Sequence, residues 1–297
     1  MPETPRTITR AALIARHTQP ALDAMLAAAA WLESRGCTPL IEAGSASALP
    51  TLSLRWDTVT REQMATSADV VVAFGGDGTL LDAARAVALG AGDAPLIGVN
   101  AGQLGFLTAI GRNDLTAGLD ALLTGGTRLE ERLLLSAVVR GANGTTTPNL
   151  GLNDVVLTRG ALSRMIEVEV RVDDQSVCRV KADGLITATA TGSTAYTLSA
   201  GGPIVHPSVD AIVLTPIAPH TLSLRPIVLP ANCRITLHPV VAPRADLYVT
   251  IDGQLNVPVE AGDVVEITRA PRVLRLLHLA GRTHFDVLRE KLSWGNQ

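Results

Sequence analysis

The chain has 297 residues, enough for two ordinary domains, and 47 % of them are apolar, so that a sizeable core can be buried. Aromatic residues make up only 3 %, which predicts a core built from Ala, Val, Leu and Ile. The net charge of −3 is spread without long runs of one sign, which argues against the basic face typical of a nucleic-acid-binding protein.

The first third of the chain alternates short apolar runs with apolar residues at helical spacing. Two of the runs, Asp69–Phe74 and Pro95–Asn100, are almost wholly apolar, as expected of strands that are buried on both faces of a parallel sheet. The alternation of strand and helix predicts an α/β domain with a mostly parallel sheet. The expected strands are 11–15, 39–43, 69–74 and 95–100, and the expected helices are 20–35, 61–67 and 80–89.

From about Glu130 the pattern changes to that of antiparallel strands with one exposed face. In the run Ile166–Val172, apolar residues alternate with charged ones. We therefore predict two domains: an α/β domain at 1–127 and a β-rich domain at 128–281, with a C-terminal helical segment, 282–297, that packs back on the first domain. The further expected elements are strands at 155–158, 185–189, 211–215, 227–229, 235–239, 247–251 and 264–268 and a helix at 284–294.

The segment FGGDGT at residues 74–79 lies between a buried strand and a helix. Its three glycines allow a sharp turn and a close approach of a ligand, and the start of the following helix favours phosphate. A carboxylate in such a loop repels phosphate, so its presence there indicates a role in the chemistry. Asp77 is therefore expected to hold Mg²⁺ or to accept the proton of an attacking hydroxyl; the alternative is a tight turn in which Asp77 caps the helix from Thr79 onward.

Two further segments place polar residues next to strands. The segment GVNAGQLGFL (98–107) runs from a buried strand into a glycine-containing loop near the same edge of the sheet, so we expect it to form a second wall of one cleft. The pair Asn153-Asp154 precedes an apolar run. This pair is either an ordinary turn or a reader of ribose hydroxyls, with the amide donating and the carboxylate accepting hydrogen bonds.

The segment 181–203 is rich in Ser, Thr and Gly. A strand at Leu185–Thr189 is expected to lead into Thr191–Thr194, whose side chains suit helix N-caps, and then into a short helix at 195–200. So many polar groups near one helix start suit a polar ligand better than a core. Tyr196 is expected to stack on a base or a nicotinamide ring, or else to be a core aromatic residue with a satisfied hydroxyl group.

Other classes of site find no support in the residue spacing. The three cysteines are far apart without a C-x-x-C pair, which argues against a disulfide framework and a cysteine zinc site and fits a reducing, cytoplasmic compartment. The six histidines show no metal-ligand spacing, so we expect no metal site built by the protein alone. The N-terminus lacks the apolar core of a signal peptide and no run approaches 18 apolar residues, so no membrane partner is expected. The balanced charge predicts no nucleic-acid partner.

Taken together, the four segments resemble the NAD kinase family. They are GGDGT (75–79), the loop 98–107, Asn153-Asp154 and DGLITATATGSTAYTLSAGGPI (183–204), and they occur in the order that the family has, within a likeness that spans residues 70–226. The resemblance implies an N-terminal α/β domain, a C-terminal β-sandwich, and phosphorylation of the adenosine ribose 2′-hydroxyl of NAD by ATP to give NADP. It also implies a divalent ion such as Mg²⁺, carried by ATP, and a homo-oligomer, a dimer or tetramer, in which a neighbouring subunit helps to complete the dinucleotide site.

The resemblance also assigns roles by position. Asp77 would be the general base, with Gly75, Gly76 and Thr79 around the donor phosphates. The family pair is commonly Asn-Glu, whereas Asp154 here has an arm one methylene shorter, so its ribose contact is expected to shift or to use a water. The NAD-binding positions would be Gly78, Asn153, Asp154, Arg164, Lys181, Asp183, Thr194, Ala195, Tyr196, Thr197, Leu198, Ser199, Ala218 and Gln254.

Two other functions remain open at this point. A lipid or sugar kinase can share the GGDGT loop, but the TGSTAY segment and the lack of an exposed apolar helix disfavour it. A catalytically silent dinucleotide sensor is a second alternative, which the intact Asp77 disfavours.

Overall fold

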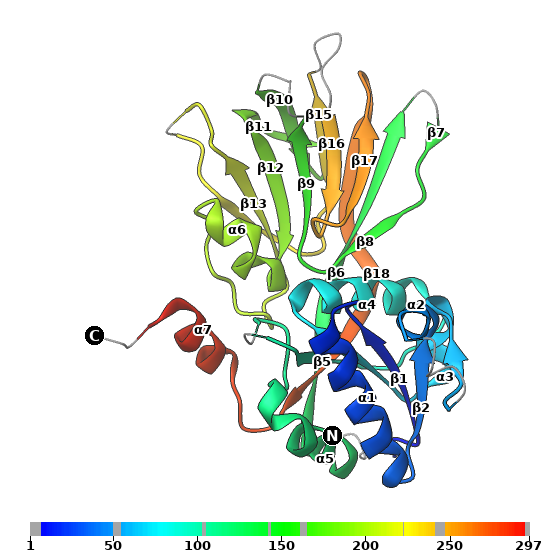
Figure 1. The fold of residues 1–297 in the computed structure, drawn as a ribbon. Coiled ribbons are helices and arrows are strands. Elements are labelled where there is room, and N and C mark those ends of the chain that lie inside the picture. The colour runs from blue at the N-terminus through cyan, green and yellow to red at the C-terminus, as the bar shows by residue number, and fades with distance from the viewer. Residues whose placement is uncertain are drawn as a thin grey trace. The chain divides into compact units, whose positions relative to one another are not determined.

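The computed structural model describes residues 7–49, 55–102, 105–141, 144–160, 165–221, 223–240 and 247–294, and its elements are labelled in Figure 1. The chain forms two compact units: unit 1 comprises Met1–Glu131 and Leu274–Gln297, and unit 2 comprises Arg132–Val273. Strands β6 (Thr127–Gly141) and β18 (Val264–Leu279) each cross a boundary between the units. Unit 2 is therefore an insertion into unit 1 along the sequence.

Unit 1 is built on a parallel sheet with the strand order β5-β4-β1-β2-β3, and the end of β18 lies beside β5. Strand β4 is buried along its whole length, as its apolar run predicts. The predicted α/β architecture with a mostly parallel sheet is confirmed. The strands are β1 (Arg10–Ala15), β2 (Thr38–Glu42), β3 (Thr58–Val59), β4 (Val70–Gly75) and β5 (Leu96–Asn100).

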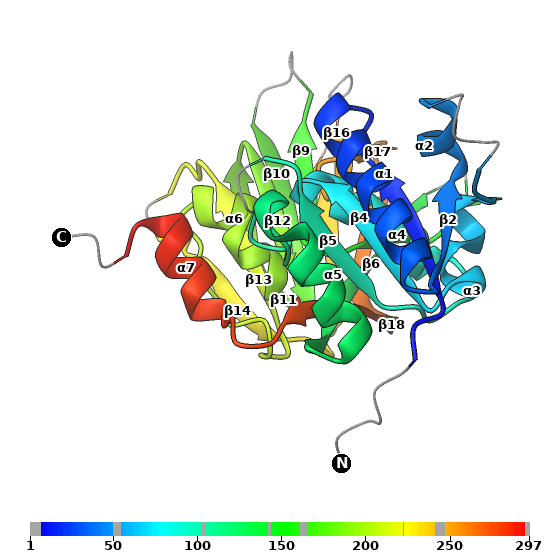
Figure 2. The same ribbon diagram turned by 60° about the horizontal axis from the view of Figure 1, so that its bottom comes forward.

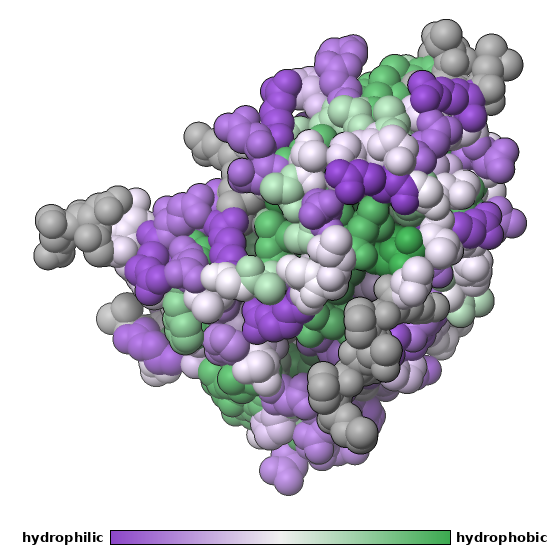
Figure 3. Space-filling model, turned by 90° about the horizontal axis from the view of Figure 1, so that it is seen from below, coloured by the Kyte–Doolittle hydropathy of each residue, from purple (hydrophilic) through white to green (hydrophobic). Residues whose placement is uncertain are grey.

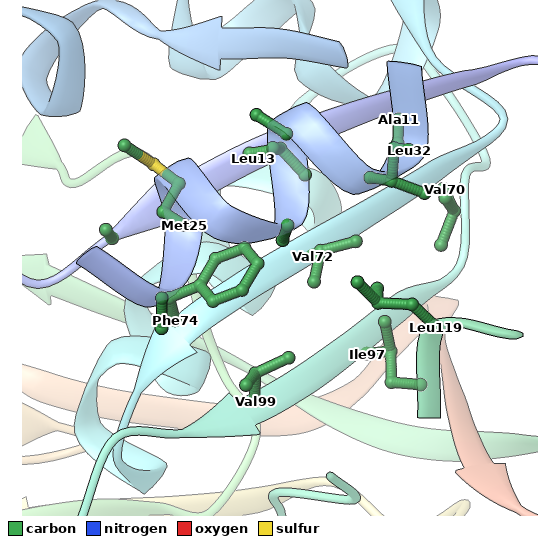
Figure 4. Close-up of a cluster of buried hydrophobic side chains, with 14 of the residues drawn as sticks. Ala11, Leu13, Met25, Leu32, Val70, Val72, Phe74, Ile97, Val99 and Leu119 are labelled. Atoms are coloured by element: carbon green, nitrogen blue, oxygen red, sulfur yellow. The ribbon is translucent and has the colours of Figure 1, made fainter. Parts of the chain in front are cut away.

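Helices cover both faces of this sheet. On one face α1 and α5 lie side by side (Figure 2), and Met25 and Leu32 of α1 pack among Leu13, Val72 and Phe74 of the strands (Figure 4). Helix α4 packs on β4 and β5 without joining that cluster, because it covers the other face. The helices are α1 (Gln19–Ser34), α2 (Ala43–Ser47), α3 (Met64–Ser67), α4 (Asp77–Leu89), α5 (Leu115–Thr124) and α7 (His284–Leu292).

Unit 2 is a β-sandwich of antiparallel strands, as the resemblance implies. One sheet has the order β14-β13-β12-β9-β16-β17, and the other contains β11-β10-β15-β18 together with β6, β7 and β8. Apolar side chains of both sheets, such as Leu157 and Val249 from the first and Val170 and Leu237 from the second, form one core. The remaining elements are β7 (Gly144–Thr145), β8 (Asn149–Gly151), β9 (Asp154–Arg159), β10 (Ile166–Val172), β11 (Gln175–Ala182), β12 (Gly184–Thr189), α6 (Tyr196–Ser199), β13 (Ala211–Ile217), β14 (Ile227–Pro230), β15 (Ile235–Pro239), β16 (Leu247–Ile251) and β17 (Leu255–Val259).

Several elements differ from the expectation in their extent. Helix α4 already begins at Asp77 instead of Leu80, because Gly76 takes the N-cap position. Helix α6 is a single turn after a 3-10 helix at Thr191–Thr194, and no Thr or Ser side chain caps it. Strand β18 continues to Leu279, well beyond the expected end at residue 268. The sequence did not predict helices α2 and α5 or strands β3, β6, β7, β8, β11 and β17.

Candidate active site

The GGDGT loop and the loop that follows β5 are joined through the side chain of Asp77. Its Oδ2 accepts a hydrogen bond from the backbone N–H of Phe106 at 2.8 Å, and its Oδ1 accepts one from the N–H of Leu107 at 3.1 Å. Asp77 is itself the first residue of α4, so the alternative in which it caps a helix beginning at Thr79 is wrong. The carboxylate is instead held at the carboxyl edge of the sheet, and each of its oxygens keeps a lone pair for a further partner.

The loop after β5 owes its conformation to polar side chains at its two ends. Asn100 accepts from the N–H of Gly102 through Oδ1 at 2.6 Å and donates from Nδ2 to Oγ1 of Thr108 at 3.2 Å. The same hydroxyl oxygen accepts from the N–H of Gly105 at 2.9 Å. The backbone N–H of Ala101 donates to the carbonyl of residue 75 at 3.1 Å, which ties this loop to the GGDGT loop. The two loops that were expected to face one cleft are thus hydrogen-bonded to each other.

The glycines of these loops serve two different purposes. A Cβ on Gly105 would lie 1.9 Å from Oδ1 of Asp77, so only glycine leaves room for the carboxylate. A Cβ on Gly75 would similarly lie 2.2 Å from Oγ1 of Thr79. At Gly76 and Gly78 a Cβ would meet no atom of the described residues within 4 Å. The space in which a side chain would lie is therefore open at these two glycines, which lets a ligand approach closely from that side.

Unit 2 contains two adjoining pockets that share Thr158 and Tyr196. The larger has a volume of about 440 Å³ and the smaller about 310 Å³. The larger is lined by Asn153, Asp154, Val156, Thr158, Ala195, Tyr196, Thr250, Asp252 and Gly253. The smaller is lined by Thr158, Arg159, Gly160, Asp183, Tyr196 and Ile217.

Asp252 organises the polar end of the larger pocket. Its carboxylate accepts three backbone N–H bonds, from Leu152 at 2.8 Å, Asn153 at 2.7 Å and Asp154 at 3.1 Å. It can do so because Asp252 and Gly253 form the turn of the β16–β17 hairpin with positive φ angles of 50° and 64°. The segment 152–154 is therefore positioned by a side chain about one hundred residues away in the sequence.

Asn153 and Asp154 present unusual polar groups to this pocket. Oδ1 of Asn153 is buried and has no hydrogen-bond partner among the described residues, so it is available to a donor on a ligand. Burial raises the pKa of the Asp154 carboxyl to about 7, and the negative charge of Asp252 adds to this effect. Asp154 therefore exchanges its proton near neutral pH, which suits a group that must either accept from or donate to a hydroxyl.

The polar segment after β12 is bound to the backbone around Asn153. The hydroxyl group of Thr189 donates to the carbonyl of Leu152 at 2.6 Å and accepts from the N–H of Gly192 at 3.0 Å. A Cβ on Gly192 would lie 2.0 Å from the carbonyl oxygen of Asn153, so the contact requires glycine. Tyr196 follows with 47 % of its surface exposed, which excludes the alternative that it is a core residue and leaves its ring free to stack.

The structure brings together only some of the residues expected to bind NAD. Those that line the two pockets are Asn153, Asp154, Asp183, Ala195 and Tyr196. Of the others, Gly78 belongs to unit 1, Arg164 lies outside the described residues, and neither pocket's described lining includes Lys181, Thr194, Thr197, Leu198, Ser199, Ala218 or Gln254.

Several of these side chains have other neighbours. Lys181 forms an ion pair with Glu167 at 3.2 Å, and Asp183 forms one with Arg159 at 3.1 Å. Thr197 is fully buried. Sequence reasoning missed the pocket residues Val156, Thr158, Arg159, Gly160, Ile217, Thr250, Asp252 and Gly253. The only signal for Asp252 and Gly253 was an Asp-Gly pair, which ordinarily indicates a hairpin turn.

The described part of the chain contains neither a cluster of metal-ligating side chains nor a helix of membrane-spanning length. No three His, Cys, Asp or Glu side chains there are grouped so that they could hold a metal ion. None of the described helices is both long enough and apolar enough to cross a membrane. On the face drawn in Figure 3, hydrophilic and hydrophobic residues are interspersed.

Known proteins match this chain over most of its length. Residues 12–127 match the family model of the ATP-NAD kinase N-terminal domain, and residues 152–279 match that of the ATP-NAD kinase C-terminal domain. The NAD kinase of Pseudomonas putida (strain W619) is 45 % identical over 260 residues, which cover 87 % of this chain and 86 % of that protein. The NAD kinase of Geobacter metallireducens is 42 % identical over 267 residues, covering 90 % and 92 %.

Two solved structures share the fold. Yeast NADH kinase complexed with NADH superposes with a TM-score of 0.87 at 22 % identity, covering 99 % of this chain and 89 % of that one. An NAD kinase from Archaeoglobus fulgidus in complex with ATP superposes with a TM-score of 0.72 at 25 % identity, covering 96 % and 98 %.

Proposed function

Because this chain belongs to the ATP-NAD kinase family, we propose that it transfers the terminal phosphoryl group of ATP to the adenosine ribose 2′-hydroxyl of NAD and so forms NADP. The observation that carries the proposal is the environment of Asp77. A carboxylate fixed by two N–H donors stands next to a loop whose glycines 76 and 78 are open to a ligand. Such a loop can take phosphate groups, and a fixed carboxylate beside them can take a proton.

Asp77 acts as the general base in this proposal. A ribose hydroxyl is a poor nucleophile at neutral pH, so a carboxylate that removes its proton as attack proceeds lowers the barrier. The N–H bonds from Phe106 and Leu107 fix the orientation of the carboxylate before the substrate arrives. The glycine backbone at residues 75–78, together with Thr79, holds the donor phosphates.

The pockets of unit 2 receive the dinucleotide. Asn153 and Asp154 bind a ribose, with the unpartnered Oδ1 of Asn153 accepting from a hydroxyl group. Asp154 is shorter than the glutamate common in the family, and Asp252 fixes the backbone that carries it. Tyr196 stacks on a ring of the dinucleotide. The further proposed contacts are Gly78, Arg164, Lys181, Asp183, Thr194, Ala195, Thr197, Leu198, Ser199, Ala218 and Gln254.

A divalent ion, Mg²⁺ for instance, enters with ATP and neutralises charge on the donor phosphates. Mg²⁺ usually keeps several water ligands and is held largely by substrate phosphates, so Asp77 remains available as the base. The same proposal places the protein in the cytoplasm as a homo-oligomer, a dimer or tetramer, in which a neighbouring subunit helps to complete the dinucleotide site. Light scattering of the purified protein, with and without NAD, measures the molar mass in solution and so tests the proposed oligomeric state.

The decisive experiment compares the wild type with Asp77→Asn in a mixture of NAD, ATP and Mg²⁺, with NADP followed by an NADP-specific dehydrogenase. Asparagine keeps the size of the side chain and removes its basicity, so we expect kcat to fall by at least about 100-fold while the Kd for NAD changes little. Near-normal turnover in this variant would remove Asp77 from the role of base.

The same assay separates the alternatives. Phosphorylation of diacylglycerol or a sugar in place of NAD would identify another kinase. NAD binding without NADP formation, with either ATP or polyphosphate as the donor, would indicate a dinucleotide sensor.

A further inference from the structure

The strand order of unit 1 reverses between β1 and β4. From β1 the chain passes through α1 to β2 and β3 on one side, and it then returns to β4 on the other side of β1 before α4 and β5. Parallel crossovers are right-handed, so connections that leave in opposite directions put α1 and α4 on opposite faces of the sheet. The loops after β1 and β4 therefore diverge at the carboxyl edge, and ligands of open α/β sheets bind in the crevice between such loops.

Two loops flank the point at the carboxyl edge where the strand order reverses. One is the GGDGT loop after β4, and the other is the loop 16–18 after β1. The two are neighbours in the sheet: Ala15 is paired with Phe74, and the backbone N–H of Arg16 donates to the carbonyl of Phe74 at 2.9 Å. Arg16 thus stands in register beside Gly75. The proposed function gives a role to the GGDGT side alone.

The side chain of Arg16 has no ion-pair or hydrogen-bond partner among the described residues, and it is exposed. Most arginines of unit 1 are engaged: Arg35 pairs with Asp120, for example, and Arg275 with Asp93. Asp77 of the GGDGT loop bonds to two backbone N–H groups and forms no ion pair with Arg16. A guanidinium without a carboxylate, beside a glycine loop with open space at residues 76 and 78, has the chemistry to bind phosphate in a bidentate manner.

We infer that Arg16 binds the phosphate chain of the nucleoside triphosphate donor, opposite the GGDGT loop across the reversal of strand order between β1 and β4. This inference rests on the proposed function, which supplies the donor. Arg16 contributes affinity for the donor and neutralises charge on its phosphates, and it does not contact NAD.

The chain offers a matched control in Arg10. Arg10 begins the same strand that Arg16 follows, it is also exposed, and it lies at the opposite, amino-terminal edge of the sheet. We propose to measure binding of ATP with Mg²⁺ by isothermal titration calorimetry, and initial rates of NADP formation, for the wild type, Arg16→Ala and Arg10→Ala. Removal of a charge-assisted contact to phosphate should raise the Kd and the KM for ATP about 10- to 100-fold in Arg16→Ala, with the KM for NAD unchanged. Arg10→Ala should match the wild type.

Two results would overturn the inference. Unchanged ATP affinity in Arg16→Ala would overturn the inference, and so would an equal loss in Arg10→Ala, since that would report net charge instead of a site. Arg16→Lys keeps the charge but loses the planar fork, so it should recover part of the affinity; it also replaces Arg16→Ala if the alanine variant does not fold by circular dichroism. If the wild type binds ATP but forms no NADP, the proposed function fails while the calorimetric comparison still decides the role of Arg16.

Discussion

The buried carboxyl group of Asp154 makes the stability of unit 2 depend on pH. Burial and the charge of Asp252 raise its pKa from 3.8 to about 7 in the folded protein, whereas in the unfolded chain the pKa returns to its ordinary value. Between these two values the folded state holds more protons than the unfolded state. The free energy of unfolding therefore falls as the pH rises from about 4 to about 7, and this contribution is level above the folded pKa.

The size of the effect follows from the same values. Each pK unit corresponds to about 1.4 kcal/mol, so a rise from 3.8 to about 7 makes the carboxylate about 4 kcal/mol less favourable in the folded protein, as an upper bound. About 2–3 kcal/mol of this difference lies between pH 5 and pH 8. The substitution Asp154→Asn keeps the shape of the side chain and removes the titrating group. The free energy of unfolding of this variant should therefore not show the fall of about 2–3 kcal/mol between pH 5 and pH 8.

Urea unfolding at pH 5 and pH 8 measures the effect. All three tryptophans, Trp31, Trp56 and Trp294, belong to unit 1, so far-ultraviolet circular dichroism is the better probe of unit 2. The control is Glu260→Gln, which removes an exposed carboxylate from the same unit and should keep the pH dependence of the wild type. An equal fall in stability between the two pH values for the wild type and Asp154→Asn would refute the reasoning.

Two glycine contacts give further predictions. In Gly105→Ala the new Cβ would lie 1.9 Å from the carboxylate of Asp77, so the base must move, and kcat should fall at least about 10-fold with an unchanged circular dichroism spectrum. Gly102→Ala, whose Cβ would be 3.8 Å from its nearest neighbour, is the control, and equal kcat values in the two variants would contradict the argument. In Gly192→Ala the Cβ meets the carbonyl of Asn153 at 2.0 Å, so we expect a loss of about 1–3 kcal/mol in urea unfolding and a higher KM for NAD; wild-type values of both would show that this backbone contact is dispensable.

The strands that are buried on both faces could be predicted from the sequence, whereas some strands with mostly exposed residues could not. Strands β4 and β5 are buried on both faces, so their apolar runs are uninterrupted and easily recognised. Strand β11 buries only Val180 and Ala182 and leaves its other residues largely exposed, so it shows no clear alternation. Helix α4 was predicted three residues too short because its first turn contains Gly78, which has a low intrinsic helix propensity.

The polar loops of the candidate site were recognisable because glycines and an unexpected carboxylate stand at strand ends. The groups that form hydrogen bonds with these loops could not be predicted from the sequence. The two N–H bonds to Asp77 depend on the pairing of β4 with β5, and the three bonds to Asp252 join segments about one hundred residues apart. Asp252-Gly253 satisfies a turn pattern by itself, so nothing in the local sequence distinguishes a turn from a turn that also positions Asn153.

The insertion of unit 2 into unit 1 has a consequence for synthesis on the ribosome. Strand β5 pairs with β18 through Leu96 and Leu276, which are made 180 residues apart. Residues 109 and 110 bond to β5 at Gly98 and Asn100, so its later half is paired early, but its start at Leu96 stays without a neighbour while the nascent chain is extended through unit 2. An apolar strand edge without a partner is open to pairing with other chains. Unit 2 is continuous in sequence, and it can complete its own sheets before unit 1 closes. A chain that terminates before Leu276 would therefore leave the start of β5 without this partner.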